Sequence, residues 1–318
     1  MLVAVLLFLV WLGILSFAAD RFVYGAAALA KNIGISPMII GLTIVAMGSS
    51  APEILVSATA SFNGNIDTAI GNALGSNITN IALVLGLTAL FKPLLIASLT
   101  LKRELPLLFS LSLLATYMLS DLTLSLVEGI ILISLFIVVI AALIWISLYL
   151  EKSDPLLAET ESDIPSNVPM FKAVIWVLVG LVLLPVSASY MVESAVVIAK
   201  VLGLSDLVIG LTIIALGTSL PELAACIAGA LKKEDDMVLG NIIGSNIFNI
   251  LAVMAMPGLI APGIIDANAA QRDAYVMLAL SGLLLMFCFN FKGVRRLERL
   301  NGLVLVGCFI TYQFLLFG

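Results

Sequence analysis

Two segments of this chain, 41–86 and 210–255, align with each other without a gap, and both are mostly apolar. Each segment has a carboxylate at the same position of the alignment, Glu53 in the first and Glu222 in the second, 169 residues apart. A charge inside a membrane costs about 3 kcal/mol or more without a partner, so a carboxylate within a membrane span marks a functional site. The sequence therefore predicts one kind of site built twice, once in each of two similar halves.

The composition is that of an integral membrane protein. Hydrophobic residues make up 62% of the chain and charged residues only 11%, whereas soluble domains are roughly half apolar and about a quarter charged. The polar–apolar alternation of membrane strands is absent, so the apolar segments are predicted to be helices. The predicted fold class is an all-α integral membrane protein with ten transmembrane helices, at 2–19, 37–61, 68–91, 104–120, 124–149, 171–199, 207–231, 237–260, 273–290 and 301–317.

The distribution of basic residues predicts the orientation in the membrane. With ten spans, Lys200 and Arg272 fall on one side and every other basic residue falls on the opposite side. Because cytoplasmic segments are enriched in Lys and Arg, we expect the basic side to face the cytoplasm and both termini to lie outside. The residues on the basic side are Arg21, Lys31, Lys92, Lys102, Arg103, Lys152, Lys172, Lys232, Lys233, Lys292, Arg295, Arg296 and Arg299.

Residue usage also excludes some chemistry. The chain has no histidine, which removes many metal-dependent and acid–base mechanisms. Cys226, Cys288 and Cys308 lie in apolar spans without C-x-x-C spacing, so we interpret them as small core residues and not as a disulfide framework or metal site. Residues 1–19 lack the charged start of a signal peptide and are interpreted as a membrane span.

The repeat extends beyond the two segments and divides the chain into halves, since Lys31 and Lys200 also stand 169 residues apart. The predicted organisation is a five-helix repeat at 1–149, a linker at 150–169 and a second five-helix repeat at 170–318. The linker is acidic and contains proline, so it is expected to be a solvated cytoplasmic connection. An odd number of spans in each half inverts the second half relative to the first, as in secondary transporters.

The first motif pair is GSSAPE at 48–53 and GTSLPE at 217–222. Proline lacks a backbone donor and clashes with the preceding turn, so both spans should break here and expose backbone carbonyls. Carbonyl, hydroxyl and carboxylate oxygens suit Na⁺ or Ca²⁺. The serine and glutamate of each motif also fit an S-x-x-E capping box, but at mid-bilayer ion binding is favoured, with capping as a compatible second role. The carbonyls expected to be freed are those around Ala46, Ser49, Ala215 and Thr218.

The second motif pair is GNALGSNITN at 71–80 and GNIIGSNIFN at 240–249. Asn72, Ser76 and Asn80 are four residues apart and share one helical face. Packing of another helix against Gly71 and Gly75 is favoured by their G-x-x-x-G spacing. In both halves this pattern accompanies a motif with a carboxylate. We therefore favour ion binding over polar packing between helices as the role of Ser76, Asn80, Ser245 and Asn249. The remaining pair, Asn77 and Asn246, is predicted to cap or tether the broken backbone.

The paired motifs G-x-[ST]-x-P-E and G-N-x-x-G-S-N-x-x-N resemble the repeats of the calcium/cation antiporter superfamily. They are most similar to the sodium/calcium exchanger family and its bacterial inner-membrane members, and the resemblance covers essentially the whole chain. It implies ten helices in two inverted halves, with four ion sites at the centre. It also implies that the first helix of each half slides across the rest of the protein and so opens the ion sites to one side of the membrane or the other. It also implies transport of Ca²⁺ and Na⁺ in a lipid bilayer, without a cofactor, nucleic acid or obligatory protein partner.

The resemblance also implies a ligand set. Ca²⁺ would be coordinated by Glu53 and Glu222 with the carbonyls of Ser49 and Thr218. The central site would be completed by Asn80 and Asn249; some exchangers carry Asp at one of these two positions, so this chain has one potential charge fewer. The Na⁺ sites would draw on Ala46, Ser50, Ser76, Ala215, Thr218, Ser219 and Ser245.

Other functions fit the residues less well. An intramembrane hydrolase needs a Ser/His or Ser/Lys pair, paired Asp or an H-E-x-x-H motif, and the central serines have no such companions, so we expect no enzymatic activity. A channel also uses central oxygens, but inverted repeats with broken helices are typical of alternating access. A non-transporting scaffold would not need the two glutamates. Within the transporters, a cation/H⁺ or K⁺-coupled divalent-cation exchanger is the alternative to Na⁺/Ca²⁺ antiport.

Overall fold

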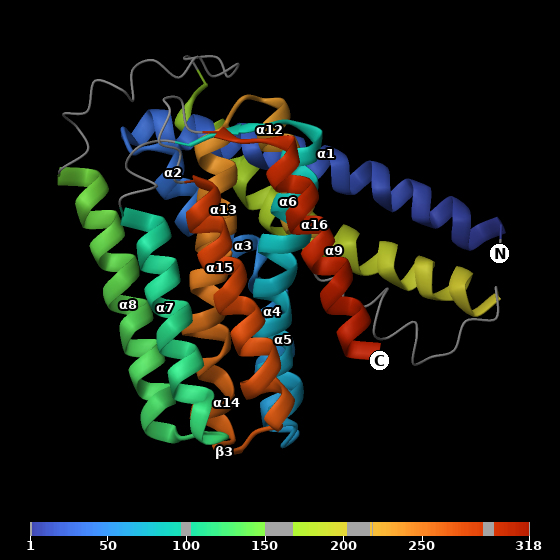
Figure 1. Cartoon of the computed structure of the whole chain (residues 1–318). Coiled ribbons are helices and arrows are strands. Elements are labelled where there is room, and N and C mark those ends of the chain that lie inside the picture. Colours follow the sequence, from blue (N-terminus) through green and yellow to red (C-terminus); the bar gives the residue numbers. More distant parts are fainter. Residues whose placement is uncertain are drawn as a thin grey trace.

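The structure of the protein, a computed structural model, describes residues 2–96, 103–149, 168–201, 217, 219–288 and 296–317. The described chain is almost entirely helical (Figure 1), with four strands of two residues each. The elements up to residue 149 are α1 (Leu2–Ile33), α2 (Pro37–Ile40), η1 (Gly41–Val45), α3 (Ala46–Ser49), α4 (Ala51–Phe62), α5 (Ile66–Ile78), η2 (Thr79–Leu85), α6 (Gly86–Phe91), β1 (Leu94–Leu95), α7 (Leu105–Met118), η4 (Leu119–Asp121), β2 (Thr123–Leu124) and α8 (Leu126–Tyr149). The later elements are α9 (Met170–Val201), α12 (Leu220–Leu231), α13 (Asp235–Phe248), η8 (Asn249–Val253), α14 (Ala255–Ile260), β3 (Gly263–Ile264), η9 (Ala269–Asp273), α15 (Ala274–Cys288), β4 (Arg296–Leu297) and α16 (Arg299–Phe317).

Seven helical segments in the described ranges are long and apolar enough to cross a membrane, and a bent pair, Pro37–Ser49 with Pro52–Phe62, qualifies as an eighth. Two further apolar helices, Leu105–Asp121 and Leu220–Leu231, are shorter. The chain is therefore a multi-pass, helical membrane protein, and the first part of the predicted span at 207–231, residues 207–216, lies outside the described residues. The seven segments are Leu2–Ile33, Ile66–Phe91, Leu126–Ile146, Met170–Ala195, Asp235–Ile260, Ala269–Cys288 and Arg299–Leu316.

The GSSAPE motif breaks its helix, as predicted. α3 ends at Ser49 and α4 begins at Ala51, and the two parts of the span meet at an angle of 47°. Between them Ser50 leaves helical geometry, with φ −89° and ψ 8°. In the GTSLPE motif Ser219 takes nearly the same angles, φ −89° and ψ 4°, and α12 begins at the next residue. The two motifs therefore share one backbone conformation at this serine and start the next helix at the same position.

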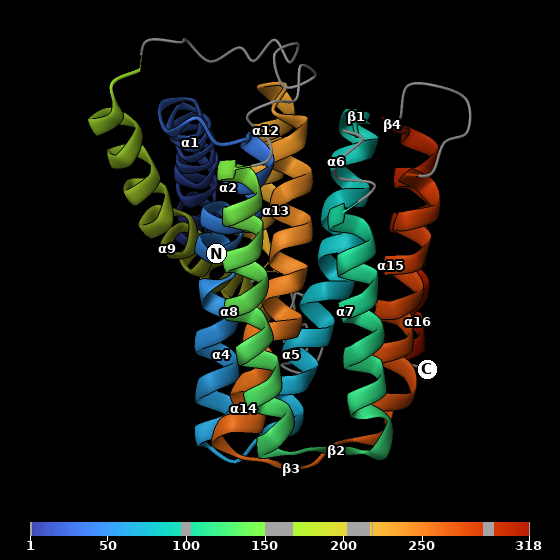
Figure 2. The same ribbon diagram turned by 90° about the vertical axis from the view of Figure 1, so that its left-hand side faces the viewer.

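Equivalent elements recur at the spacing of 169 residues. α4 and α12 begin and end at equivalent positions, and α7 and α15 begin at Leu105 and Ala274. The strands recur too, because β3 follows β1 at that spacing. β1 pairs antiparallel with β4, and β2 with β3. Figure 2 shows the β1–β4 sheet at the top of the bundle and the β2–β3 sheet at the bottom, so equivalent strands lie at opposite ends.

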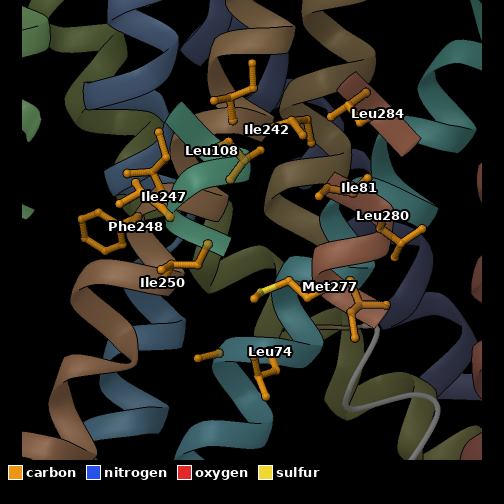
Figure 3. Packing of buried hydrophobic residues seen from close by; sticks show 14 of the residues in the cluster. Leu74, Ile81, Leu108, Ile242, Ile247, Phe248, Ile250, Met277, Leu280 and Leu284 are labelled. Carbon is orange, nitrogen blue, oxygen red and sulfur yellow. The ribbon is translucent and has the colours of Figure 1, made fainter. Parts of the chain in front are cut away.

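The largest apolar cluster fills the centre of the bundle, where α5, η2, α7, α13 and α15 meet. Figure 3 shows part of it, with Leu74 and Ile81 from the first half near Met277 and Leu280 from the second. The apolar window within Asp235–Ile260 is completely covered by other parts of the protein. α13 is therefore the central helix of the fold, and the motif it carries lies in the middle of the bundle.

Glycines set the closest helix crossing. A Cβ on Gly240 would lie 2.4 Å from a carbonyl oxygen of α2, and one on Gly41 would lie 2.5 Å from a carbonyl oxygen of α13. The broken span and α13 therefore touch through their backbones, as small residues allow in membranes. Among the described residues, no other helix lies within 4 Å of the Cβ position at Gly71 or Gly75. The segment of the second half that is equivalent to the one around Gly41 falls outside the described residues.

α1 and α9 pack against each other at one side of the bundle and form a second apolar cluster (Figure 1). α1 continues to Ile33, well beyond the first predicted span. Two charged residues just after the predicted span contact neighbouring helices. The Asp20 carboxylate pairs with Lys232 Nζ at 2.5 Å, and the Arg21 guanidinium lies 5.3 Å from the ring centre of Trp176.

Candidate ion-binding site

Two buried carboxylates form the centre of the candidate site. Glu53 and Glu222 lie in the first turns of α4 and α12, immediately after the two backbone breaks. Pro52 and Pro221 start the same helices, where a missing amide hydrogen costs little. The glutamates are only 1% and 0% exposed, and they lie close enough for their charges to repel each other. Such a pair is unfavourable unless a cation balances the charge.

The two serines of the first break connect it to the second half. Ser50 Oγ donates a hydrogen bond to Glu222 Oε1 at 3.2 Å. Ser49 Oγ donates to Asn241 Oδ1 at 3.3 Å and also lies 3.4 Å from the Ala46 carbonyl oxygen. Both serines are fully buried. The broken helix of one half is thus held by polar side chains of the other half.

Several buried polar atoms near the carboxylates have no hydrogen-bond partner within the described part of the chain. They lie on α4, η2, α13 and η8 and in or just before α12, where η8 packs against α4 and α13, and α12 packs against η2 and α13. Buried polar groups are normally hydrogen-bonded, and a cation bound among these oxygens would satisfy them. The atoms are Glu53 Oε2, Glu222 Oε2, Ser219 Oγ, Ser245 Oγ and both amide atoms of Asn80 and of Asn249.

The backbone around the two asparagines is unusual. Asn80 and Asn249 lie in the first turn of the π-helical stretches η2 and η8. Wider helical turns of this kind occur frequently at functional sites. Ser76, one turn before Asn80, is buried at 6% exposure. Asn80, Ser245 and Asn249 are buried as well, and the part these four residues play as ion ligands stays a prediction.

Three of the predicted ligands need separate comment. Ala215 and Thr218 lie outside the described residues. Ala46 is fully buried, and its carbonyl oxygen accepts the Ser50 amide at 2.9 Å. The expectation that the break leaves this carbonyl without a hydrogen bond is therefore wrong, because the last turn of α3 closes onto Ser50. A carbonyl oxygen has a second lone pair, which is the one that a cation would use.

The sequence assigned no role to Asn72, although this residue supports the site. Its Nδ2 donates to the Glu53 carbonyl oxygen at 3.0 Å and so joins α5 to the start of α4. Within the described residues, the asparagines expected to tether the broken backbone make other contacts. Asn77 Nδ2 contacts the Met277 sulfur at 3.4 Å, and Asn246 Nδ2 donates to a carbonyl within its own helix at 2.7 Å.

The chemistry of the site is that of hard oxygen ligands. Among the described residues, no three His, Cys, Asp or Glu side chains are placed to hold a metal ion together. Two carboxylates with neutral hydroxyl and amide oxygens instead suit Na⁺ or Ca²⁺. Fold and site define a multi-pass membrane protein with a buried, oxygen-lined candidate cation site, the arrangement found in secondary transporters.

Comparison with known proteins identifies the family. The sodium/calcium exchanger protein family matches residues 3–145 and 172–318. The chain is 54% identical over 318 residues to the putative antiporter CaxA of Alkalimonas amylolytica, covering 100% of both chains. It is 41% identical to the inner membrane protein YrbG of Escherichia coli strain K12, covering 100% of this chain and 98% of that protein.

The fold is also similar to a solved structure, that of the sodium-calcium exchanger NCX_Mj. The match has a TM-score of 0.82 at 32% identity and covers 98% of this chain and 97% of that one. The chain belongs to the sodium/calcium exchanger family, which confirms the family predicted from the paired motifs. Its relatives in this family are transporters and not enzymes.

Proposed function

We propose that this protein is a secondary antiporter that exchanges Na⁺ for Ca²⁺ across the inner membrane by alternating access. The observation that carries the proposal is the pair of buried carboxylates, Glu53 and Glu222, which follow the two backbone breaks and lie close enough for their charges to interact. Two carboxylates balance the charge of one Ca²⁺, or of Na⁺ ions held with neutral oxygens. The same oxygens cannot serve full sets of both ions at once, so competition for them couples the two fluxes.

In this proposal Glu53 and Glu222 are ligands shared between the two ions. The carbonyls of Ser49 and Thr218 complete the Ca²⁺ shell, and the unpartnered amide oxygens of Asn80 and Asn249 support a place for these residues at its centre. The Na⁺ ligands are drawn from Ala46, Ser50, Ser76, Ala215, Thr218, Ser219 and Ser245.

The hydrogen bond from Ser50 to Glu222 suggests how ion binding changes the contact between the halves. Without a cation, the hydroxyl group donates its hydrogen to the carboxylate. A cation at Glu222 replaces that hydrogen, and the Ser50 oxygen can then turn a lone pair toward the ion. Ion binding would thus exchange a direct hydrogen bond between halves for a bridge through the ion.

The proposed fold has ten transmembrane helices in two inverted repeats, 1–149 and 170–318, joined by a cytoplasmic linker at 150–169 with both termini outside. The β1–β4 and β2–β3 sheets support the inversion, because equivalent strands lie at opposite ends of the bundle. Exchange of conformations between inverted repeats converts a site open to one side into a site open to the other. Placement in the inner membrane is supported by the similarity to YrbG.

The test is Ca²⁺ uptake by purified protein in Na⁺-filled liposomes diluted into Na⁺-free medium. We expect uptake that requires the Na⁺ gradient and is abolished by Glu53→Gln or Glu222→Gln, since each change removes one of two balancing charges. Glu128→Gln is the matched control, because this carboxylate bonds only locally to Ser125 in the described chain. Uptake driven by an H⁺ or K⁺ gradient instead of Na⁺ would reject the assigned driving ion.

A further inference from the structure

Cys226 follows Glu222 by one helical turn in α12, so both side chains lie on the same face of that helix. The thiol is fully buried. At the equivalent position of α4, one turn after Glu53, the chain has Ser57. The second half therefore carries a sulfur atom where the first half carries a hydroxyl group.

The two side chains have different surroundings. Ser57 Oγ donates to the Val253 carbonyl oxygen of η8 at 3.0 Å. Cys226 Sγ instead accepts a hydrogen bond from Asn241 Nδ2 at 3.4 Å, and the other amide atom of Asn241 accepts from Ser49. The sulfur is thus part of the polar network at the helix break, which is more than the role of small core residue that the sequence indicated.

A second observation at this position points to a ligand. Glu222 Oε2 is buried and has no hydrogen-bond partner within the described residues. The Glu222 carboxylate also lies near enough to Cys226 to interact with it electrostatically. An unsatisfied carboxylate oxygen and a hydrogen-bonded sulfur therefore belong to neighbouring side chains on consecutive turns of one helix face.

We propose that Glu222 and Cys226 form a binding site for a thiophilic divalent cation, for which Cd²⁺ is the probe. Thiolate sulfur prefers soft cations, whereas Na⁺ and Ca²⁺ prefer oxygen. On Cd²⁺ binding the Cys226 thiol releases its proton to the solution, and thiolate and carboxylate together balance the two positive charges. Asn241 orients the sulfur. The site shares Glu222 with the proposed exchange site, but it does not depend on which ion drives transport.

The test measures Cd²⁺ binding and not transport. In a Cys288→Ser, Cys308→Ser background Cys226 is the single thiol of the chain. Purified protein is titrated with Cd²⁺ while the ultraviolet thiolate-to-cadmium charge-transfer absorption is followed, and the affinity is measured by equilibrium dialysis with radioactive cadmium. We expect the absorption band in the background protein and its loss in Cys226→Ser. Glu222→Gln keeps the thiol and should weaken Cd²⁺ binding roughly tenfold or more.

A swapped variant provides the matched control. Cys226→Ser combined with Ser57→Cys keeps one thiol and one hydroxyl at these positions, but the new thiol takes the place of a group bonded to η8. We expect this variant to lack the tight Cd²⁺ site while eluting as a folded protein from a sizing column. Equal Cd²⁺ affinity in the swapped variant, or in Glu222→Gln, would overturn the proposal. Absence of Na⁺-driven Ca²⁺ uptake would reject the proposed exchange and leave this result standing.

Discussion

Asn72 holds Glu53 in place without being a predicted ion ligand. Its amide nitrogen donates to the Glu53 carbonyl oxygen at 3.0 Å, from α5 to the first turn of α4. The start of a helix is its least constrained part, because the first amides have no partner within the helix. The position of the Glu53 carboxylate therefore depends on this side-chain bond as well as on the helix.

We predict that Asn72→Leu raises the Ca²⁺ concentration for half-maximal uptake about fivefold, the equivalent of ~1 kcal/mol for one lost hydrogen bond. The measurement is the Ca²⁺ dependence of Na⁺-driven uptake in liposomes. Asn32→Leu is the control, because Asn32 also donates to backbone carbonyls, those of Ala28 and Val168, but at the end of α1. An equal change in the control would show a general loss of packing instead of a local effect on Glu53.

The role of Asn72 shows a limit of reasoning from the sequence at the scale of residues. The spacing placed Asn72, Ser76 and Asn80 on one helical face, and the repeat singled out the two glutamates, because both are properties of the local chain. Which group an asparagine bonds depends on the helix packed against it. Asn77 was therefore assigned to the broken backbone, although it faces Met277 of α15.

At the scale of secondary-structure elements, features set by the local chain could also be predicted from the sequence, and features set by distant contacts could not. The break after Ser49 could be predicted because Gly48 and Pro52 act on their own turn. The length of α1 could not be predicted from the sequence, because a charged residue such as Asp20 is typical of the end of an apolar span. Its partner is Lys232, which is far along the chain and reaches Asp20 only through the packing of α1 against α12.

One end of the bundle is held by an ion pair between elements. Lys92 Nζ lies 3.1 Å from Asp235 Oδ1 and donates to the Ala230 carbonyl oxygen at 2.6 Å. Asp235 Oδ2 accepts the Leu95 amide of β1 at 3.0 Å. The pair therefore ties the end of α6 and β1 to the turn between α12 and α13. At the equivalent positions of the repeat the chain has Ala261 and Ile66, which carry no charge.

We predict that Lys92→Ala lowers stability by about 3 kcal/mol, because it leaves the Asp235 carboxylate, at 6% exposure, without its counter-charge. The double variant Lys92→Ala, Asp235→Ile copies the apolar residues of the opposite end and should recover most of the loss. Thermal unfolding of the purified protein in detergent measures both. A double variant less stable than Lys92→Ala would contradict this explanation.

At the scale of the whole molecule, inversion of the two halves has a direct consequence for the turns that follow α4 and α12. Phe62 ends α4 and Leu231 ends α12, at equivalent positions of the repeat. Both side chains are exposed, at 76% and 61%. In a parallel repeat the two residues would reach the same side of the membrane, and in an inverted repeat they must reach opposite sides.

We predict that Phe62→Cys and Leu231→Cys, each in a chain whose Cys226, Cys288 and Cys308 are replaced by serine, react from opposite sides of the membrane. A membrane-impermeant maleimide added to intact cells with an accessible periplasm should label Phe62→Cys. It should label Leu231→Cys only after the inner membrane is opened, because the neighbouring Lys232 and Lys233 place that turn on the basic, cytoplasmic side. Labelling of both from one side would reject the inverted repeat, whereas reversed labelling would keep the inversion and reject the orientation.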